Sequence, residues 1–169
     1  MEVEAARSAL VLVDLMDRIV ALPLRPRSGD QVLATSLELA GRFRAAGATV
    51  AAIRVERPGV AEQPPGSGLA AGVAAAADLV VVKRTIGGFH GTDLDERLRG
   101  RGVDTLVFAG IATNMGVEST ARAAADHGYE LVFVEDAMAT FTGEEHRAAI
   151  GFGLPRFGTV VTAAGVRLG

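Results

Sequence analysis

The stretch Thr105-Leu106-Val107-Phe108-Ala109-Gly110-Ile111-Ala112-Thr113-Asn114-Met115-Gly116 decides the fold of this chain of 169 residues. Its first half is strongly apolar and predicts a buried strand, whereas residues 118–127 are typical of a helix. Backbone N–H groups at the start of such a helix are unpaired and lie at the positive end of its dipole. We therefore expect the turn to bind an anion or an oxyanion, with Asn114 as the N-cap and Gly116 allowing close approach of a ligand.

Apolar runs alternate with helical patterns along the rest of the chain. Strands are expected at residues 8–13, 48–55, 78–82, 104–109, 130–134 and 159–162. Helices are expected at residues 30–46, 93–99, 114–128 and 143–152, with a short helix or loop at 69–77. Strands that are apolar throughout favour a parallel sheet that is buried on both faces. The alternation predicts a single doubly wound α/β domain over residues 1–169.

Composition excludes several classes of protein. The net charge of −3 offers no basic face for nucleic acid. The chain has no cysteine, which excludes disulfides and Cys-ligated metal and fits a reducing compartment. No apolar run approaches the ~20 residues of a membrane helix. The acidic N-terminus, Met1–Ala5, lacks a signal-peptide pattern, so a cytoplasmic location is expected.

Two charged residues stand where apolar strands end, Asp14 after the first strand and Lys83 after the third. Ligands of open α/β sheets bind outside the carboxyl ends of the strands, where these residues would lie near the Gly110–Gly116 turn. From the residues alone, a turn-forming Asp and a solvated Lys are the commoner interpretations of these two positions.

The sequence GIATN…VESTAR resembles the active-site signature of the isochorismatase-like hydrolases, also called cysteine hydrolases, and the resemblance covers roughly residues 9–161. It implies a Rossmann-like sheet of six mostly parallel strands in the order 3-2-1-4-5-6, with helices on both faces. LVLVDLM and VVVKR match the family's catalytic Asp and Lys at Asp14 and Lys83. The resemblance also implies a non-proline cis peptide at Ile111–Ala112, with oxyanion donors at Ala112 and Gly116.

Gly116 occupies the position at which most members of the family carry the nucleophilic Cys. Replacement of that nucleophile by Thr113 or Ser119 is disfavoured, because the first is expected to bond the turn and the second to lie a helical turn deeper. The isochorismatases also resemble this chain in having Gly there, and in them a protonated Asp donates to the enol-ether carbon. This chain departs from them in Ala112, where they have Tyr, and in the segment after Lys83.

Three further residues are candidates for contact with the substrate: Phe89, His90 and Arg54, of which Arg54 could meet an anionic group. No His pair has the spacing of metal ligands, and the segment after the second strand lacks the His found in nicotinamidases. No metal and no cofactor are therefore expected.

The resemblance implies a small hydrolase with a small-molecule substrate, for which an anion is one candidate. Asp14 would be the general acid, Lys83 its electrostatic partner, and the reaction enol-ether hydrolysis. The alternatives are an inactive relative that binds a ligand or partner, and an amide or C–N hydrolase using a route without Cys. An engineered Cys-to-Gly change is a third alternative. The small residues at 121–125 permit close packing of subunits, and the resemblance implies a homo-oligomer, a dimer or larger.

Overall fold

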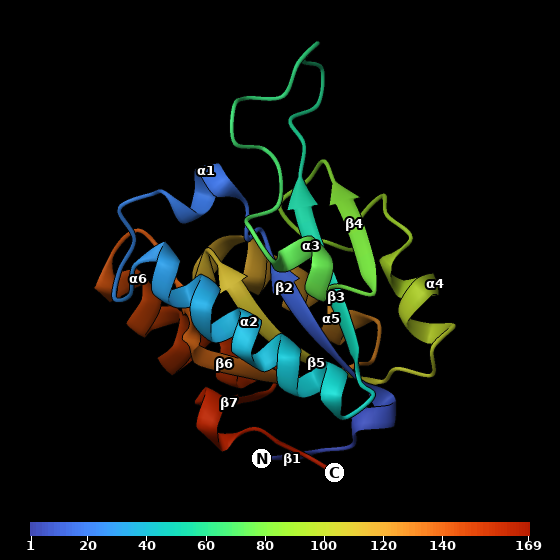
Figure 1. The fold of residues 1–169 in the computed structure, drawn as a ribbon. Coiled ribbons are helices and arrows are strands. Elements are labelled where there is room, and N and C mark those ends of the chain that lie inside the picture. Colours follow the sequence, from blue (N-terminus) through green and yellow to red (C-terminus); the bar gives the residue numbers. More distant parts are fainter.

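Six parallel strands form the central sheet in a computed structural model that describes all residues 1–169 (Figure 1). They are β2 (Ser8–Val13), β3 (Thr49–Val55), β4 (Leu79–Lys83), β5 (Thr105–Ile111), β6 (Glu130–Ala139) and β7 (Thr159–Val161). Their order is β4-β3-β2-β5-β6-β7, and every neighbouring pair is parallel. Counted along the chain, this is the expected order 3-2-1-4-5-6.

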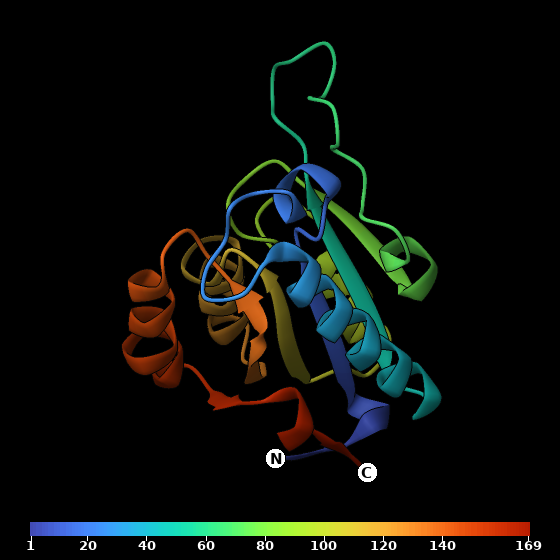
Figure 2. The same ribbon diagram turned by 60° about the vertical axis from the view of Figure 1, so that its left-hand side comes forward.

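Helices cover both faces of the sheet, as Figures 1 and 2 show together. One face packs on α2 (Gly29–Ala45) and α3 (Val73–Ala76), and the other on α4 (Leu94–Arg99) and α5 (Glu118–Asp126). The central strand β2 divides its side chains between them. Leu10 and Leu12 join the hydrophobic cluster that contains α2, whereas Ala9, Val11 and Val13 join the cluster that contains α4 and α5. The continuous apolar run of β2 follows from this double burial.

Helix α2 begins at a capping box. The Ser28 hydroxyl accepts from the Gln31 N–H at 3.2 Å, and the Gln31 side-chain oxygen accepts from the Ser28 N–H at 3.0 Å. The two contacts satisfy donors that a helix start leaves unpaired. Helix α6 (Gly143–Ala148) begins in a similar way, with the Thr142 hydroxyl accepting from the Glu145 N–H at 3.2 Å.

The structure differs from the expected elements in five places. The expected helix at 114–128 begins with a π-helical turn, Thr113–Val117, and α5 follows it. Only residues 73–76 of the 69–77 segment are helical, and β6 continues past residue 134 to Ala139. The short helix α1 (Asp17–Val20) was not expected, nor was the two-stranded sheet of β1 (Glu2–Val3) and β8 (Arg167–Leu168).

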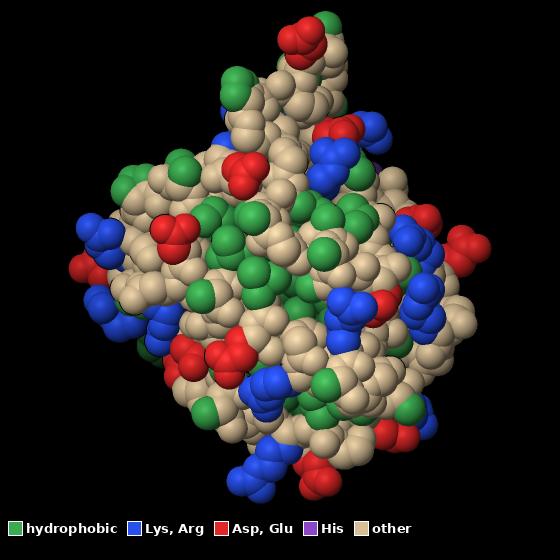
Figure 3. All heavy atoms as spheres, in the orientation of Figure 1, with side chains coloured by type: hydrophobic (Ala, Val, Ile, Leu, Met, Phe, Trp, Pro, Cys, Tyr) green, Lys and Arg blue, Asp and Glu red, His purple; other side chains and the backbone are tan.

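The segment between β3 and α3 projects from the body of the molecule (Figures 1 and 2). Its base is closed by Gln63, whose amide accepts from the Arg57 N–H at 2.8 Å and donates to the Arg57 carbonyl at 3.0 Å. In the space-filling view, hydrophobic side chains gather below the projection and charged ones lie mostly toward the periphery (Figure 3). None of the helices has the length and apolar character needed to cross a membrane.

Candidate active site

A cavity of about 420 Å³ opens at the carboxyl ends of the central strands. Its walls come from the residues that follow β2, β3, β4 and β5, and from Phe141 after β6. Parallel strands bring their carboxyl ends to one edge of the sheet, so residues far apart in sequence meet there. Asp14, Lys83, Ile111, Ala112 and Gly116, which the sequence analysis named as candidates, all line this cavity.

Asp14 directly follows β2 and has a left-handed backbone, with φ of 52°. Asp is among the few side chains that tolerate this region. The Asp14 N–H donates to the Ile53 carbonyl at 2.9 Å, which fixes the residue at the end of the strand. Its side chain is 9% exposed. Burial raises the pKa of the Asp14 carboxyl, and this effect outweighs the Lys83 ammonium, which acts in the opposite direction.

Lys83 is the last residue of β4, and its side chain is almost completely buried. Its Nζ lies 2.8 Å from Asp14 Oδ2 and also donates to the Ile86 carbonyl. An ammonium group has three donors, so one remains for a ligand. Asp14 Oδ1 is buried and has no hydrogen-bond partner in the protein. The pair therefore has an acid oxygen and an N–H donor that the protein itself leaves unused.

Gly116 lies directly against this pair. A Cβ added at Gly116 would be 3.0 Å from Asp14 Oδ2 and 3.2 Å from Lys83 Nζ. Any side chain at this position would press against both charged groups.

Gly110 is required for a different reason, because its φ is 126° and an added Cβ would lie 2.2 Å from the Val13 carbonyl oxygen. Glycine there lets β5 approach the end of β2.

The peptide bond between Ile111 and Ala112 is cis, as the resemblance implied. Three threonines support the turn that follows it. The Thr113 hydroxyl is hydrogen-bonded to His146 Nδ1 at 2.9 Å, and the Thr120 hydroxyl donates to the Gly116 carbonyl at 2.6 Å. The Thr140 hydroxyl donates to the Asn114 side-chain oxygen at 2.6 Å. That contact occupies Asn114, which makes no capping bond, so the expected N-cap is wrong.

His146 is a residue of the site that sequence reasoning missed. Its ring is 2% exposed, and burial, aided by Arg27, lowers the pKa of its imidazole. It lies 33 positions from Thr113, and neither the periodicity nor the spacing of the chain signals the contact. Thr113 is fully buried against it and does not line the cavity.

The remainder of the cavity is mostly apolar. The side chains that form this part are Ile19, Leu22, Val55, Ile86, Met115 and Phe141. Leu22, Ile86, Met115 and Phe141 are each more than a third exposed, so they form an apolar rim open to solvent. Such a rim favours a ligand with an apolar body.

Phe89, His90 and Arg54 do not line the cavity. The Phe89 ring stacks on His127, with centroids 5.0 Å apart, and packs in the core under α4 and α5. His90 is exposed to solvent. Arg54 is paired with Glu56 at 2.8 Å. Their expected contact with a substrate therefore has no support in the geometry.

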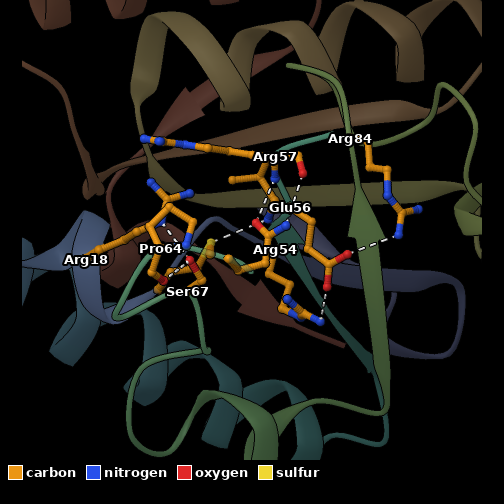
Figure 4. A network of polar contacts seen from close by, with 10 residues as sticks. Arg18, Arg54, Glu56, Arg57, Pro64, Ser67 and Arg84 are labelled. Carbon is orange, nitrogen blue, oxygen red and sulfur yellow. Dashed lines mark hydrogen bonds and ion pairs between the residues drawn. The ribbon is translucent and has the colours of Figure 1, made fainter. Parts of the chain in front are cut away.

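Glu56 joins two arginines at the cavity edge, as Figure 4 shows. It pairs with Arg54 at 2.8 Å and with Arg84 at 3.0 Å. Arg18 and Arg57 line the cavity as well, and neither forms an ion pair. No group of three or more His, Cys, Asp or Glu side chains is arranged to hold a metal ion.

The chain is similar to known proteins over almost its whole length. The sequence matches the isochorismatase domain over residues 8–165. It is 37% identical to the isochorismatase family protein YecD of Escherichia coli O157:H7, over 95% of this chain and 94% of that protein. This chain belongs to the isochorismatase family and is a hydrolase of that family.

Two further comparisons agree with this assignment. The solved structure of an isochorismatase family protein from Burkholderia thailandensis superposes with a TM-score of 0.83 and 39% identity, covering 95% of this chain and 94% of that one. A ureidoacrylate amidohydrolase, RutB of Variovorax paradoxus, is 38% identical over 71% of this chain and 42% of its own length. The relatives thus establish the family of this chain, and its reaction is inferred from the residues of its own site.

Proposed function

We propose that this protein hydrolyses enol ethers of pyruvate without a covalent nucleophile, with Asp14 as the general acid. The observation that carries the proposal is the Asp14–Lys83 pair in the wall of the cavity, next to Gly116, which has no side chain that could act as a nucleophile. A substrate in the cavity would meet the carboxyl group directly. The raised pKa of Asp14 favours the protonated form that an acid catalyst needs.

The reaction would run in three steps. The Asp14 carboxyl gives its proton to the terminal CH2 carbon of the enol ether, which leaves an oxocarbenium ion at the adjacent carbon. Water adds to that carbon and returns a proton to the Asp14 carboxylate. The resulting hemiketal breaks its C–O bond to the alcohol and releases pyruvate. The remaining N–H of Lys83, whose other contacts are Asp14 and the Ile86 carbonyl, would bind the substrate carboxylate next to the reacting carbon.

Amide hydrolysis is a second candidate, because of the similarity to RutB. It would need a nucleophile at the cavity. The Thr113 hydroxyl is bonded to His146, and neither Thr113 nor Ser119 lines the cavity. Thr85 lines it, but its hydroxyl donates to the Gly87 carbonyl at 2.9 Å. These placements favour the route that needs no nucleophile.

The test is pyruvate release from isochorismate and from 2-phenoxyacrylate, a minimal enol ether, by the parent and by Asp14→Asn. We expect turnover by the parent and a loss of at least ~100-fold in the variant, the range of a general acid. Ammonia release from ureidoacrylate is measured in parallel. Ammonia release without pyruvate release would overturn the proposal in favour of amide hydrolysis. No turnover of any substrate would favour an inactive, ligand-binding relative.

A further inference from the structure

We propose that Arg18 and Arg57 form an anion-binding subsite, which selects substrates with a second carboxylate on the apolar body. The location of the reacting carbon in this inference rests on the proposed function, whereas the anion subsite itself does not. Both arginines line the cavity that contains Asp14 and Lys83.

The charges of the cavity are not balanced. Its acidic residues are Asp14 and Glu56, and both are already paired: Asp14 with Lys83 at 2.8 Å, and Glu56 with Arg84 at 3.0 Å. Arg18 and Arg57 remain as cations without an acidic partner. The chain as a whole carries a net charge of −3, so this positive excess is local to the cavity. A cleft lined by one sign of charge concentrates ligands of the opposite sign.

Arg18 is held in place by a contact that leaves its binding groups open. Its Nε donates to the Ser67 hydroxyl at 3.2 Å, and that hydroxyl donates in turn to the Pro64 carbonyl at 2.6 Å (Figure 4). The two terminal nitrogens of Arg18 have no acceptor in the protein. A planar guanidinium fixed at Nε presents the terminal N–H pair that binds a carboxylate.

Arg57 is positioned through its backbone. The Gln63 amide holds both its N–H and its carbonyl, at 2.8 and 3.0 Å. In Figure 4 the Arg57 side chain extends away from Glu56, and its guanidinium makes no contact with that carboxylate. The Arg57 backbone is therefore fixed while its side chain stays free to meet a ligand.

Binding of saturated analogues tests the subsite separately from catalysis. The probes are 2-(3-carboxyphenoxy)propanoate and 2-phenoxypropanoate, which lack the enol double bond and differ only in the ring carboxylate. Calorimetric titration of the parent should show tighter binding of the dicarboxylate by roughly tenfold or more, since a charge-assisted hydrogen bond has about that effect. The preference should shrink as salt is raised.

Arg18→Met should remove most of this preference, and Arg57→Met should reduce it. The matched control is Arg84→Met, because Arg84 lines the same cavity but is paired with Glu56. It should keep the preference. Ser67→Ala should reduce the preference by a smaller factor than Arg18→Met, since it removes only the hydroxyl that fixes Arg18. Thermal unfolding of each variant checks that the fold is retained. Because Arg57 lies on the projecting segment, Arg57→Met tests the subsite without changing α1, the helix that contains Arg18.

Equal binding of both probes by the parent would overturn the subsite, as would an equal loss in Arg18→Met and Arg84→Met. The outcome for the proposed function is read separately. A carboxylate preference without pyruvate release retains the subsite and removes the enol-ether proposal. Turnover of 2-phenoxyacrylate without any preference for the dicarboxylate probe retains the enol-ether proposal and removes the subsite.

Discussion

Replacing Gly116 with Ala should separate activity from stability. The added methyl would lie 3.0 Å from Asp14 Oδ2, 3.2 Å from Lys83 Nζ and 3.2 Å from Val13 Cγ1. Each distance is short, so the neighbouring groups would have to move by a few tenths of an ångström. Ala in place of Gly in a helical turn gains up to ~1 kcal/mol from the unfolded chain, which these contacts offset. We expect the free energy of unfolding to change by less than about 1 kcal/mol.

The effect on catalysis should be much larger. The methyl would push against the Asp14 carboxyl and the Lys83 ammonium, and misplacement of a reacting group by ~1 Å can lower a rate by ~100-fold. Such a loss in kcat/KM corresponds to about 2.7 kcal/mol of transition-state stabilisation. The assay is pyruvate release from 2-phenoxyacrylate, together with chemical denaturation of both proteins.

Gly41→Ala is the control for the backbone effect. Gly41 lies inside α2, and a Cβ there meets no atom within 4 Å. It should gain a few tenths to about 1 kcal/mol of stability and keep full activity. A Gly116→Ala protein whose kcat/KM stays within about twofold of the parent would refute the reasoning, because catalysis would then not depend on the positions of Asp14 and Lys83.

Two other predictions follow from the buried contacts of the site. Thr113→Val and His146→Leu should each lower kcat by roughly tenfold with little change in KM. The double variant should be no worse than either single variant, because both changes remove the same hydrogen bond. His146→Asn can restore that bond and should recover activity, whereas additive losses in the double variant would contradict the account. Lys83→Met removes the cation that lowers the pKa of Asp14, so that pKa should rise further. A carboxyl with a raised pKa stabilises the fold below its ordinary value of ~3.9, and this contribution is lost as pH rises through the raised pKa. Relative to the parent, Lys83→Met should therefore lose stability as pH rises above the ordinary pKa of a carboxyl group, by up to ~3 kcal/mol; a pH-independent difference in denaturation midpoints would argue against a buried Asp14 charge.

The positions of Asp14 and Lys83 could be predicted from local signals, whereas the order of the sheet came only from the resemblance to the family. β2 and β4 are built on continuous apolar runs, and Asp14 follows the first while Lys83 ends the second. The prediction lost accuracy where polar residues interrupt an element. Glu135 and Asp136 suggested the end of a strand, yet Ala137, Met138 and Ala139 continue β6 and are fully buried.

The remaining parts of the site depend on tertiary contacts that no periodicity reveals. Arg54 was expected to meet an anionic substrate, but its neighbour Glu56, two residues along the same segment, pairs with it instead. Arg18 lies in α1, a helix of four residues that is too short to produce a pattern. Its role follows only from Ser67, which the projecting segment brings to it across 49 positions.

The pH dependence of pyruvate release tests the acid role of Asp14 most directly. Because only the protonated carboxyl can donate a proton to the enol-ether carbon, kcat/KM for 2-phenoxyacrylate should be highest at acid pH and fall as pH rises through the raised pKa of Asp14. A rise of kcat/KM with pH over the same range would show that the ionised carboxylate is the active form, and would contradict general-acid catalysis by Asp14.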